Sequence, residues 1–144
     1  MIPEKNPEEA SAYYDLGINY HSMGNLVEAR RYFSVFKKIA EEEWIKKWPD
    51  DAGTYIAISV VSARLNEMES SKLMFRRAVE IDSTLHDRFA EVFCVQGNLN
   101  SAISELDKAF QNGYRNLFWL KISPDLQVLQ SEVRYRNMMK KVFR

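Results

Sequence analysis

Residues 10–43 read ASAYYDLGINYHSMGNLVEARRYFSVFKKIAEEE, and this stretch predicts two helices joined by a tight turn. In its first half, positions i, i+3, i+4 and i+7 form one helix face, which carries Tyr13, Leu16, Gly17 and Tyr20. The triplet Gly24-Asn25-Leu26 indicates a turn, because glycine is favoured where a helix ends. The inner face of the second helix carries small and aromatic residues: Ala29, Phe33 and Phe36. We expect the two helices to approach most closely where the small residues lie.

The same pattern recurs along the chain. Gly97-Asn98-Leu99 repeats the turn, with matching residues before it and after it: Phe89, Ala90, Phe93, Ala102 and Leu106. The two copies lie about two periods of 34 residues apart, so one degenerate unit is expected between them. Its turn is Asn66-Glu67-Met68, where asparagine tolerates the left-handed conformation that a turn needs. Ser59 and Ser71 occupy its small-residue positions.

This spacing resembles the tetratricopeptide repeat, a helical hairpin of about 34 residues. One such hairpin cannot bury its own apolar face, so repeats stack on one another. The resemblance implies an all-α fold in a single domain over residues 1–144, with three hairpins stacked into a short right-handed superhelix (solenoid). The predicted parts are repeat one at about 10–51, repeat two at about 52–82, repeat three at about 83–113 and a cap at 114–144.

Repeat one is predicted to carry an extended second helix. After a short lead-in over residues 1 to about 7, Pro7-Glu8-Glu9 favours a helix start, since proline suits the first turn and acids suit the positive end of the dipole. The second helix meets no breaker until Pro49. Trp44 and Trp48 then lie on one side of a helical arm at i,i+4 spacing. They either pack on the middle unit or offer a second interface to a partner.

The pattern changes after Gly113. The tail contains Tyr114, the pair Trp119-Leu120, the run Pro124-Asp125-Leu126 and a final short helix. These steps resemble the end-of-group module that closes tetratricopeptide arrays in many bacterial proteins, although Ser123 and Glu132-Val133 depart from its usual acid and acid-proline. The resemblance implies a bacterial source and a cap. Physically, Leu126, Leu129, Tyr135 and Met138 can cover the apolar face of the last repeat.

Composition excludes several classes of function. The net charge is zero, which argues against a nucleic-acid partner bound by counterion release and against an anionic membrane surface. The single cysteine, Cys94, allows no internal disulfide and favours a reducing compartment. No apolar run reaches the length of a membrane span, and the polar N-terminus is unlike a secretory signal. A cytoplasmic location is therefore expected.

The sequence contains no catalytic signature. Phosphate-binding glycine loops, zinc-protease motifs, paired cysteines and nucleophile elbows are all lacking. His21 and His86 lie in different repeats, and a zinc site that combined them with Cys94 would need a fourth ligand, so no metal site or cofactor is predicted. Cys94 is expected to be a buried filler. The basic pairs at 30–31, 37–38, 46–47 and 76–77, the acids at 41–43 and the basic tail are interpreted as solvated faces.

The resemblance also implies a binding groove. In tetratricopeptide proteins the first helix of each hairpin lines a concave surface, and the corresponding face here carries Tyr14, Ile18, His21, Ile56, Val60, Arg64, Asp87, Arg88, Glu91 and Cys94. The helix at about 53–65 is apolar almost all round, so neighbouring elements could instead cover these residues. The clamp that some family members use for acidic chaperone tails matches only at Arg88, which disfavours that ligand.

The predicted function is therefore a protein–protein interaction adaptor or scaffold, not an enzyme, that binds a peptide or helix of another protein. Two alternatives stay open. The chain could be a regulatory repeat fragment of a larger signalling enzyme, associated with a kinase or cyclase domain. It could also be a structural module that forms a homodimer through the apolar groove or through Trp44 and Trp48.

Overall fold

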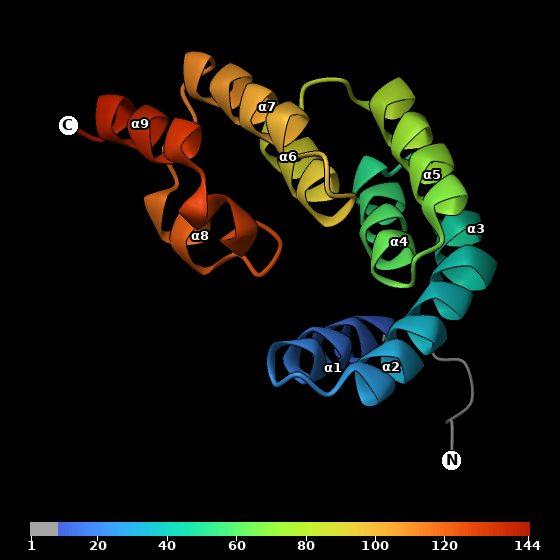
Figure 1. Ribbon diagram of the computed structural model, residues 1–144. Helices are drawn as coiled ribbons and strands as arrows, with labels where there is room; N and C mark the ends of the chain where they lie inside the picture. Colours follow the sequence, from blue (N-terminus) through green and yellow to red (C-terminus); the bar gives the residue numbers. More distant parts are fainter. Residues whose placement is uncertain (1–8) are drawn as a thin grey trace. The chain divides into compact units, whose positions relative to one another are not determined.

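The computed structural model describes residues 9–144, and all of their regular elements are helical, as predicted (Figure 1). These residues divide into two compact units, one up to Ile81 and one from Asp82 onwards. The predicted lead-in and the helix start at Pro7 and Glu8 lie outside the described residues. The superhelical stacking of the three repeats stays a prediction.

The first unit contains two helical hairpins (Figure 1). They are α1 (Ala10–Ser22) with α2 (Leu26–Ile39), and α4 (Ala52–Arg64) with α5 (Met68–Ile81). Their shared core contains Ala29, Phe33, Phe36, Ile39, Ile58, Val61 and Leu65. A Cβ atom on Gly17 would lie 2.5 Å from the Phe33 ring, which confirms that α1 and α2 approach closely at this glycine.

The three hairpin turns share one backbone geometry. Gly24, Asn66 and Gly97 have φ angles of 79°, 61° and 82°, so the prediction that Asn66 replaces a turn glycine is confirmed. In each turn the following amide reaches back to a helix carbonyl, for example from Glu67 to Ser62 at 2.8 Å. This bond satisfies a carbonyl that the helix end would otherwise leave without a partner.

The second helix of repeat one continues beyond α2, as predicted. A π-helical turn, η2 (Ala40–Trp44), leads into α3 (Ile45–Lys47), and the helix ends before Pro49. A π turn accommodates one extra residue and so rotates the side chains that follow it. Trp44 consequently packs against the core of the first unit, with its ring 5.4 Å from that of Phe36.

The basic face of α2 is only partly solvated, which corrects the sequence interpretation. Lys37 does pair with Glu41 at 3.6 Å, as i,i+4 spacing predicts. Its ammonium group also donates to Glu67 at 3.0 Å and to Ser70 at 3.1 Å, and Arg30 donates to the Leu65 carbonyl at 3.3 Å. These side chains therefore tie α2 to the second hairpin, because the core packing brings the two hairpins together.

The second unit contains one hairpin and the folded tail (Figure 1). The hairpin is α6 (His86–Val95) with α7 (Leu99–Gln111), and the tail forms α8 (Leu117–Ile122), the 3₁₀ segment η3 (Gln127–Ser131) and α9 (Val133–Val142). Helix α6 begins at His86 rather than at about 84, because Asp82 accepts hydrogen bonds from the backbone and hydroxyl of Thr84 at 2.9 and 2.6 Å and holds a turn there.

The tail covers the hairpin of the second unit. Leu120, Leu126, Leu129 and Tyr135 are buried in one cluster with Leu106 and Phe110 of α7. Gly113, with φ of 96°, ends α7, and Asn116 caps α8 by accepting a bond from the Trp119 amide at 3.0 Å. The apolar residues predicted to cover the last hairpin therefore do so.

Candidate interaction site

The groove residues predicted on α1 pack largely within the first unit. Tyr14 lies 5.3 Å from Phe36 and 6.3 Å from Phe33, ring centre to ring centre. Ile18 and Tyr14 are both half-buried against the core cluster that includes Ile58 and Val61 of α4. Only part of each side chain is therefore left to contact a partner.

Ile56 and Val60 correct the prediction. Their side chains are 1% and 2% exposed, so neither offers a free apolar surface. The reason is the composition of α4, which is apolar almost all round and has buried residues on every side. These two residues belong to the interior.

His21 and Arg64 do meet, as their predicted positions on one face suggest. Arg64 Nη1 lies 3.4 Å from His21 Nδ1, and the guanidinium carbon lies 5.9 Å from the centre of the Phe33 ring. His21 is exposed and Arg64 is half-buried. They form a polar edge where α1 and α4 come together.

In the second unit, Glu91 corrects the prediction of a charged groove end. Asp87 is half-buried and Arg88 is exposed, but Glu91 is 6% exposed and accepts a hydrogen bond from Trp119 Nε1 at 2.9 Å. The tail packs over α6 and binds the Glu91 carboxylate through Trp119, so little of Glu91 is left for a partner to contact.

Glu91 has an unusual protonation equilibrium. Burial is the main cause that raises its pKa from 4.5 to about 7, and the negative charge of Asp125 raises the pKa further. The hydrogen bond from Trp119 and the positive charge of Arg88 both act to lower the pKa. A buried carboxyl resists ionisation because the charged form loses its hydration. Glu91 thus changes charge close to neutral pH while it holds the tail.

The histidines and the cysteine form no metal centre. Within residues 9–144, no group of three histidine, cysteine or acidic side chains could hold a metal ion. His86 pairs with Glu105 at 2.7 Å, and Cys94 is buried in the core of the second unit, as expected of a filler. Burial raises the pKa of the Cys94 thiol to about 12, which is opposite to the shift of a reactive cysteine.

Trp44 and Trp48 play different parts. Trp44 packs on the core of the first unit, whereas Trp48 is 39% exposed. The two rings meet edge to face at 5.9 Å, and Lys47 Nζ lies 4.8 Å from the centre of the Trp48 ring. Of the pair, only Trp48 presents a substantial aromatic surface to solvent.

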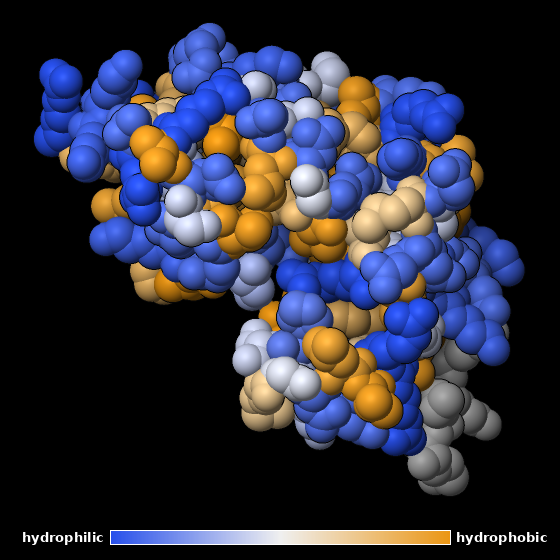
Figure 2. All heavy atoms as spheres, in the orientation of Figure 1, coloured by the Kyte–Doolittle hydropathy of each residue, from blue (hydrophilic) through white to orange (hydrophobic). Residues whose placement is uncertain are grey.

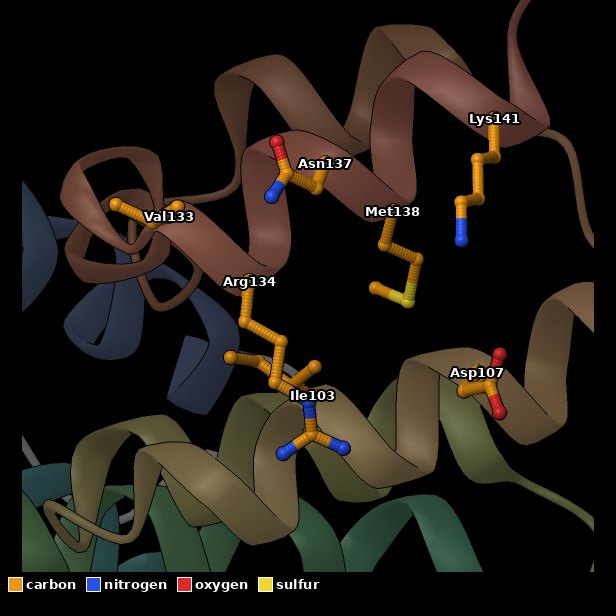
Figure 3. A pocket seen from close by; sticks show the side chains of 7 residues that line it. All are labelled: Ile103, Asp107, Val133, Arg134, Asn137, Met138 and Lys141. Atoms are coloured by element: carbon orange, nitrogen blue, oxygen red, sulfur yellow. The ribbon is translucent and has the colours of Figure 1, made fainter.

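The second unit contains an open groove of about 640 Å³ between α7 and α9 (Figure 3). Helix α7 contributes Ile103 and Asp107 to its lining. Helix α9 contributes Val133, Arg134, Asn137, Met138 and Lys141. Figure 3 shows Met138 and Lys141 extending from α9 towards α7, with Arg134 towards Ile103. The groove thus combines apolar side chains with charges of both signs.

The charge on α9 is of one sign. Residues 133–142 contain four cationic side chains and no acid: Arg134, Arg136, Lys140 and Lys141. Across the part of the chain that the structure describes, no hydrogen bond or ion pair engages the Arg134 or Lys141 side chains. The two cations that line the groove are therefore available to a ligand.

Sequence reasoning missed this groove because it treated the basic tail as a solvated face. One signal was present in the sequence. Basic residues on a solvated helix are usually accompanied by acids at i±3 or i±4, but the four cations of α9 have one such acid between them, Glu132 at i−4 from Arg136. That imbalance indicates a cationic helix face but does not show which helix lies opposite it.

Other exposed apolar side chains lie among polar ones, and Figure 2 shows both kinds interspersed on the face drawn. They include Met23, Leu26 and Val27 at the first turn, and Phe118 and Ile122 on α8. None of these side chains lines the groove between α7 and α9. They are weaker candidates than the groove.

Among the helices of residues 9–144, none combines the length and the apolar character that a bilayer crossing demands. Comparison with curated proteins and with solved structures gave no match. Comparison with family models matched residues 52–85 to the tetratricopeptide repeat. This segment covers α4 and α5, the hairpin whose turn glycine is replaced by Asn66. The hairpin of α4 and α5 is therefore a tetratricopeptide repeat, set within residues 9–144 whose regular elements are all helical.

Proposed function

We propose that the protein is an adaptor without catalytic activity of its own, which binds a segment of another protein. The observation that carries this proposal is the tetratricopeptide repeat at residues 52–85, since such repeats form protein–protein interaction modules. The hairpin of α1 and α2 shares a core with this repeat and so supplies a packed neighbour that helps to bury its apolar face.

The groove between α7 and α9 is the proposed docking surface. It is open, it is lined by apolar and charged side chains, and its cations have no partner within residues 9–144. The predicted groove residues of the first unit offer less, because Ile56 and Val60 are buried and Tyr14 and Ile18 are half-buried. Two secondary contact sites are also proposed. One is the edge formed by His21 and Arg64 in the first unit, and the other is Asp87 with Arg88 in the second.

The test is affinity capture from a native lysate, followed by reconstitution with the purified captured protein. We expect calorimetry to show a stoichiometric complex. The variant Leu106→Asp, which unfolds the second unit, should lose this complex, and the control Lys72→Ala, at an exposed residue, should keep it. Retention by the unfolded variant would indicate non-specific adsorption. A chain that captures no protein under any condition contradicts the proposal.

A homodimer is the second candidate, and the exposed ring of Trp48 favours it. An aromatic side chain beside a cation is a common centre of an interface. Light scattering at increasing concentration separates the two candidates. A dimer that Trp48→Ala converts to a monomer would support self-association. A wild-type chain that is monomeric at all concentrations would contradict the dimer and favour the adaptor function.

A further inference from the structure

We propose that the groove between α7 and α9 recognises an acidic peptide segment with an apolar side chain between its carboxylates. This inference rests on the proposed function and specifies the chemistry of the partner. It assigns the groove to an acidic protein segment rather than to a lipid or a nucleic acid. The groove has an apolar floor, two spaced cations on α9 and an acid on its opposite wall.

The floor of the groove is apolar. Ile103 of α7 is buried, Met138 of α9 is half-buried, and Val133 at one end is 60% exposed (Figure 3). A methionine side chain adapts its shape to whatever fills the space beside it. An aliphatic side chain of a ligand placed here would cover Val133 and Met138 and remove apolar surface from water.

The cations are spaced for a peptide. Arg134 and Lys141 lie two helical turns apart on α9, about 10 Å along its axis. An extended segment covers that distance in about three residues. Asn137 lies between them and lines the same groove, so its amide group can pair with the backbone of the segment. Two carboxylates three residues apart, with apolar side chains between them, match this arrangement.

The opposite wall gives the ligand an orientation. Asp107 lines the groove from α7, and Gln111 donates to its carboxylate at 2.9 Å. An acidic segment is repelled by Asp107 and attracted by Arg134 and Lys141, so it is held against α9. The repulsion also predicts that neutralising Asp107 strengthens binding.

Nucleic acid and membrane fit this groove less well. The phosphates of a nucleic acid would need many cations, but the whole chain has no net charge and Asp107 lies within the groove. A membrane binds apolar side chains that project outwards, whereas Ile103 and Met138 lie inside a hollow. An acidic peptide with one apolar anchor uses both the charge and the hollow.

The experiment uses the full chain and a short fluorescent peptide in which two leucines separate each glutamate from the next, measured by anisotropy at low and moderate salt. Arg134→Glu and Lys141→Glu are each expected to weaken binding by roughly three- to tenfold. Asp107→Asn is expected to strengthen it. The matched control is Arg136→Glu, which makes the same charge change on the same helix at an exposed residue that does not line the groove. It should change the affinity by less than about twofold.

Other ligands test the specificity. Peptides with lysine in place of glutamate, or with serine in place of leucine, should bind much more weakly. Equal losses from Arg136→Glu and Arg134→Glu, or preferential binding of single-stranded DNA or of vesicles with anionic lipid, would overturn the proposal. If the chain captures a protein partner but Arg134→Glu and Lys141→Glu leave that complex unchanged, the adaptor function stands and this assignment of the groove fails.

Discussion

Ser59 of α4 and Ser71 of α5 bind each other's backbone reciprocally. The Ser59 hydroxyl donates to the Ser71 carbonyl at 2.7 Å, the Ser71 hydroxyl donates to the Ser59 carbonyl at 2.8 Å, and the two hydroxyl oxygens lie 3.2 Å apart. Both residues are fully buried. The pair therefore joins the two helices where their small side chains allow close approach, and it satisfies two buried hydroxyl groups without water.

Replacing one serine of this pair should lower the free energy of unfolding by more than the loss of its own hydrogen bonds accounts for. Ser59→Val inserts a bulkier side chain and leaves the Ser71 hydroxyl with one partner fewer, so we expect the free energy of unfolding to fall by about 1–3 kcal/mol. Urea denaturation measures this. Ser34→Ala is the control, because the exposed Ser34 hydroxyl binds only its own helix, at the Arg30 carbonyl. An equal loss in both variants would contradict a special role for the buried pair.

Gly17→Ala should destabilise the first hairpin although alanine is the better helix former. The added Cβ would meet the Phe33 ring at 2.5 Å, and Phe33 is itself buried. We expect a loss of about 1–3 kcal/mol in the free energy of unfolding. Phe33→Leu in the same chain should recover part of that loss, since a smaller side chain makes room.

The control for Gly17→Ala is Asn19→Ala on the exposed face of the same helix. It should leave stability unchanged or slightly raised, because alanine has the higher helix propensity. A Gly17→Ala protein as stable as this control would show that α1 and α2 are less tightly packed than the structure indicates.

Trp44 and Trp48 should differ in their contribution to stability. Trp44 contacts the core through Phe36, so Trp44→Ala is expected to lower the free energy of unfolding by about 2–4 kcal/mol. Trp48 is largely in contact with Trp44 and Lys47 at the surface, so Trp48→Ala should cost about 1 kcal/mol or less. Circular dichroism during urea denaturation checks both values. Equal losses would mean that the two rings form one structural unit.

Glu91 should make stability depend on pH near neutrality. Its pKa in the folded chain is raised to about 7 by burial, by comparison with 4.5 for an exposed glutamate. The folded state therefore binds the proton more tightly than the unfolded state, so stability falls as pH rises from about 4.5 to about 7 and then levels off. The total change is on the order of 1–3 kcal/mol.

Glu91→Gln should flatten this pH profile and raise the melting temperature at pH 8, because the amide carbonyl still accepts the bond from Trp119 without a charge. Thermal denaturation at several pH values measures the effect. The control is Glu69→Gln, an exposed acid on α5 whose variant should keep the wild-type profile. A Glu91→Gln profile with the wild-type slope would place the titrating group elsewhere.

Local pattern was sufficient to predict the helical hairpins. The turn at Gly24 recurs at Gly97, and Asn66 was predicted to replace the glycine between them; all three residues adopt positive φ. These features depend on interactions within a few residues, such as the amide of Glu67 reaching the Ser62 carbonyl. The sequence also predicted that Leu126, Leu129 and Tyr135 cover the last hairpin, because the final unit of a repeat array needs a cap over its apolar face, and all three are buried.

The candidate site depended on contacts between elements distant in the chain, which no local pattern specifies. Glu91 was predicted to lie at the charged end of a groove, but the tail brings Trp119 over it and buries it. Likewise, the sequence predicted that Lys37 lies on a solvated face. The packing of the two hairpins instead places Glu67 Oε1 3.0 Å from Lys37 Nζ.

The groove between α7 and α9 illustrates the same division. The sequence by itself determined that residues 133–142 carry four cationic side chains and no acid. Only the tertiary structure decided that Ile103 and Asp107 of α7 lie opposite this helix and line an open groove of about 640 Å³ with it. The physical reason is that helix formation is governed by neighbouring residues, whereas the docking of α9 follows from the burial of Tyr135 and Leu129 with Leu106, a contact across a long stretch of chain.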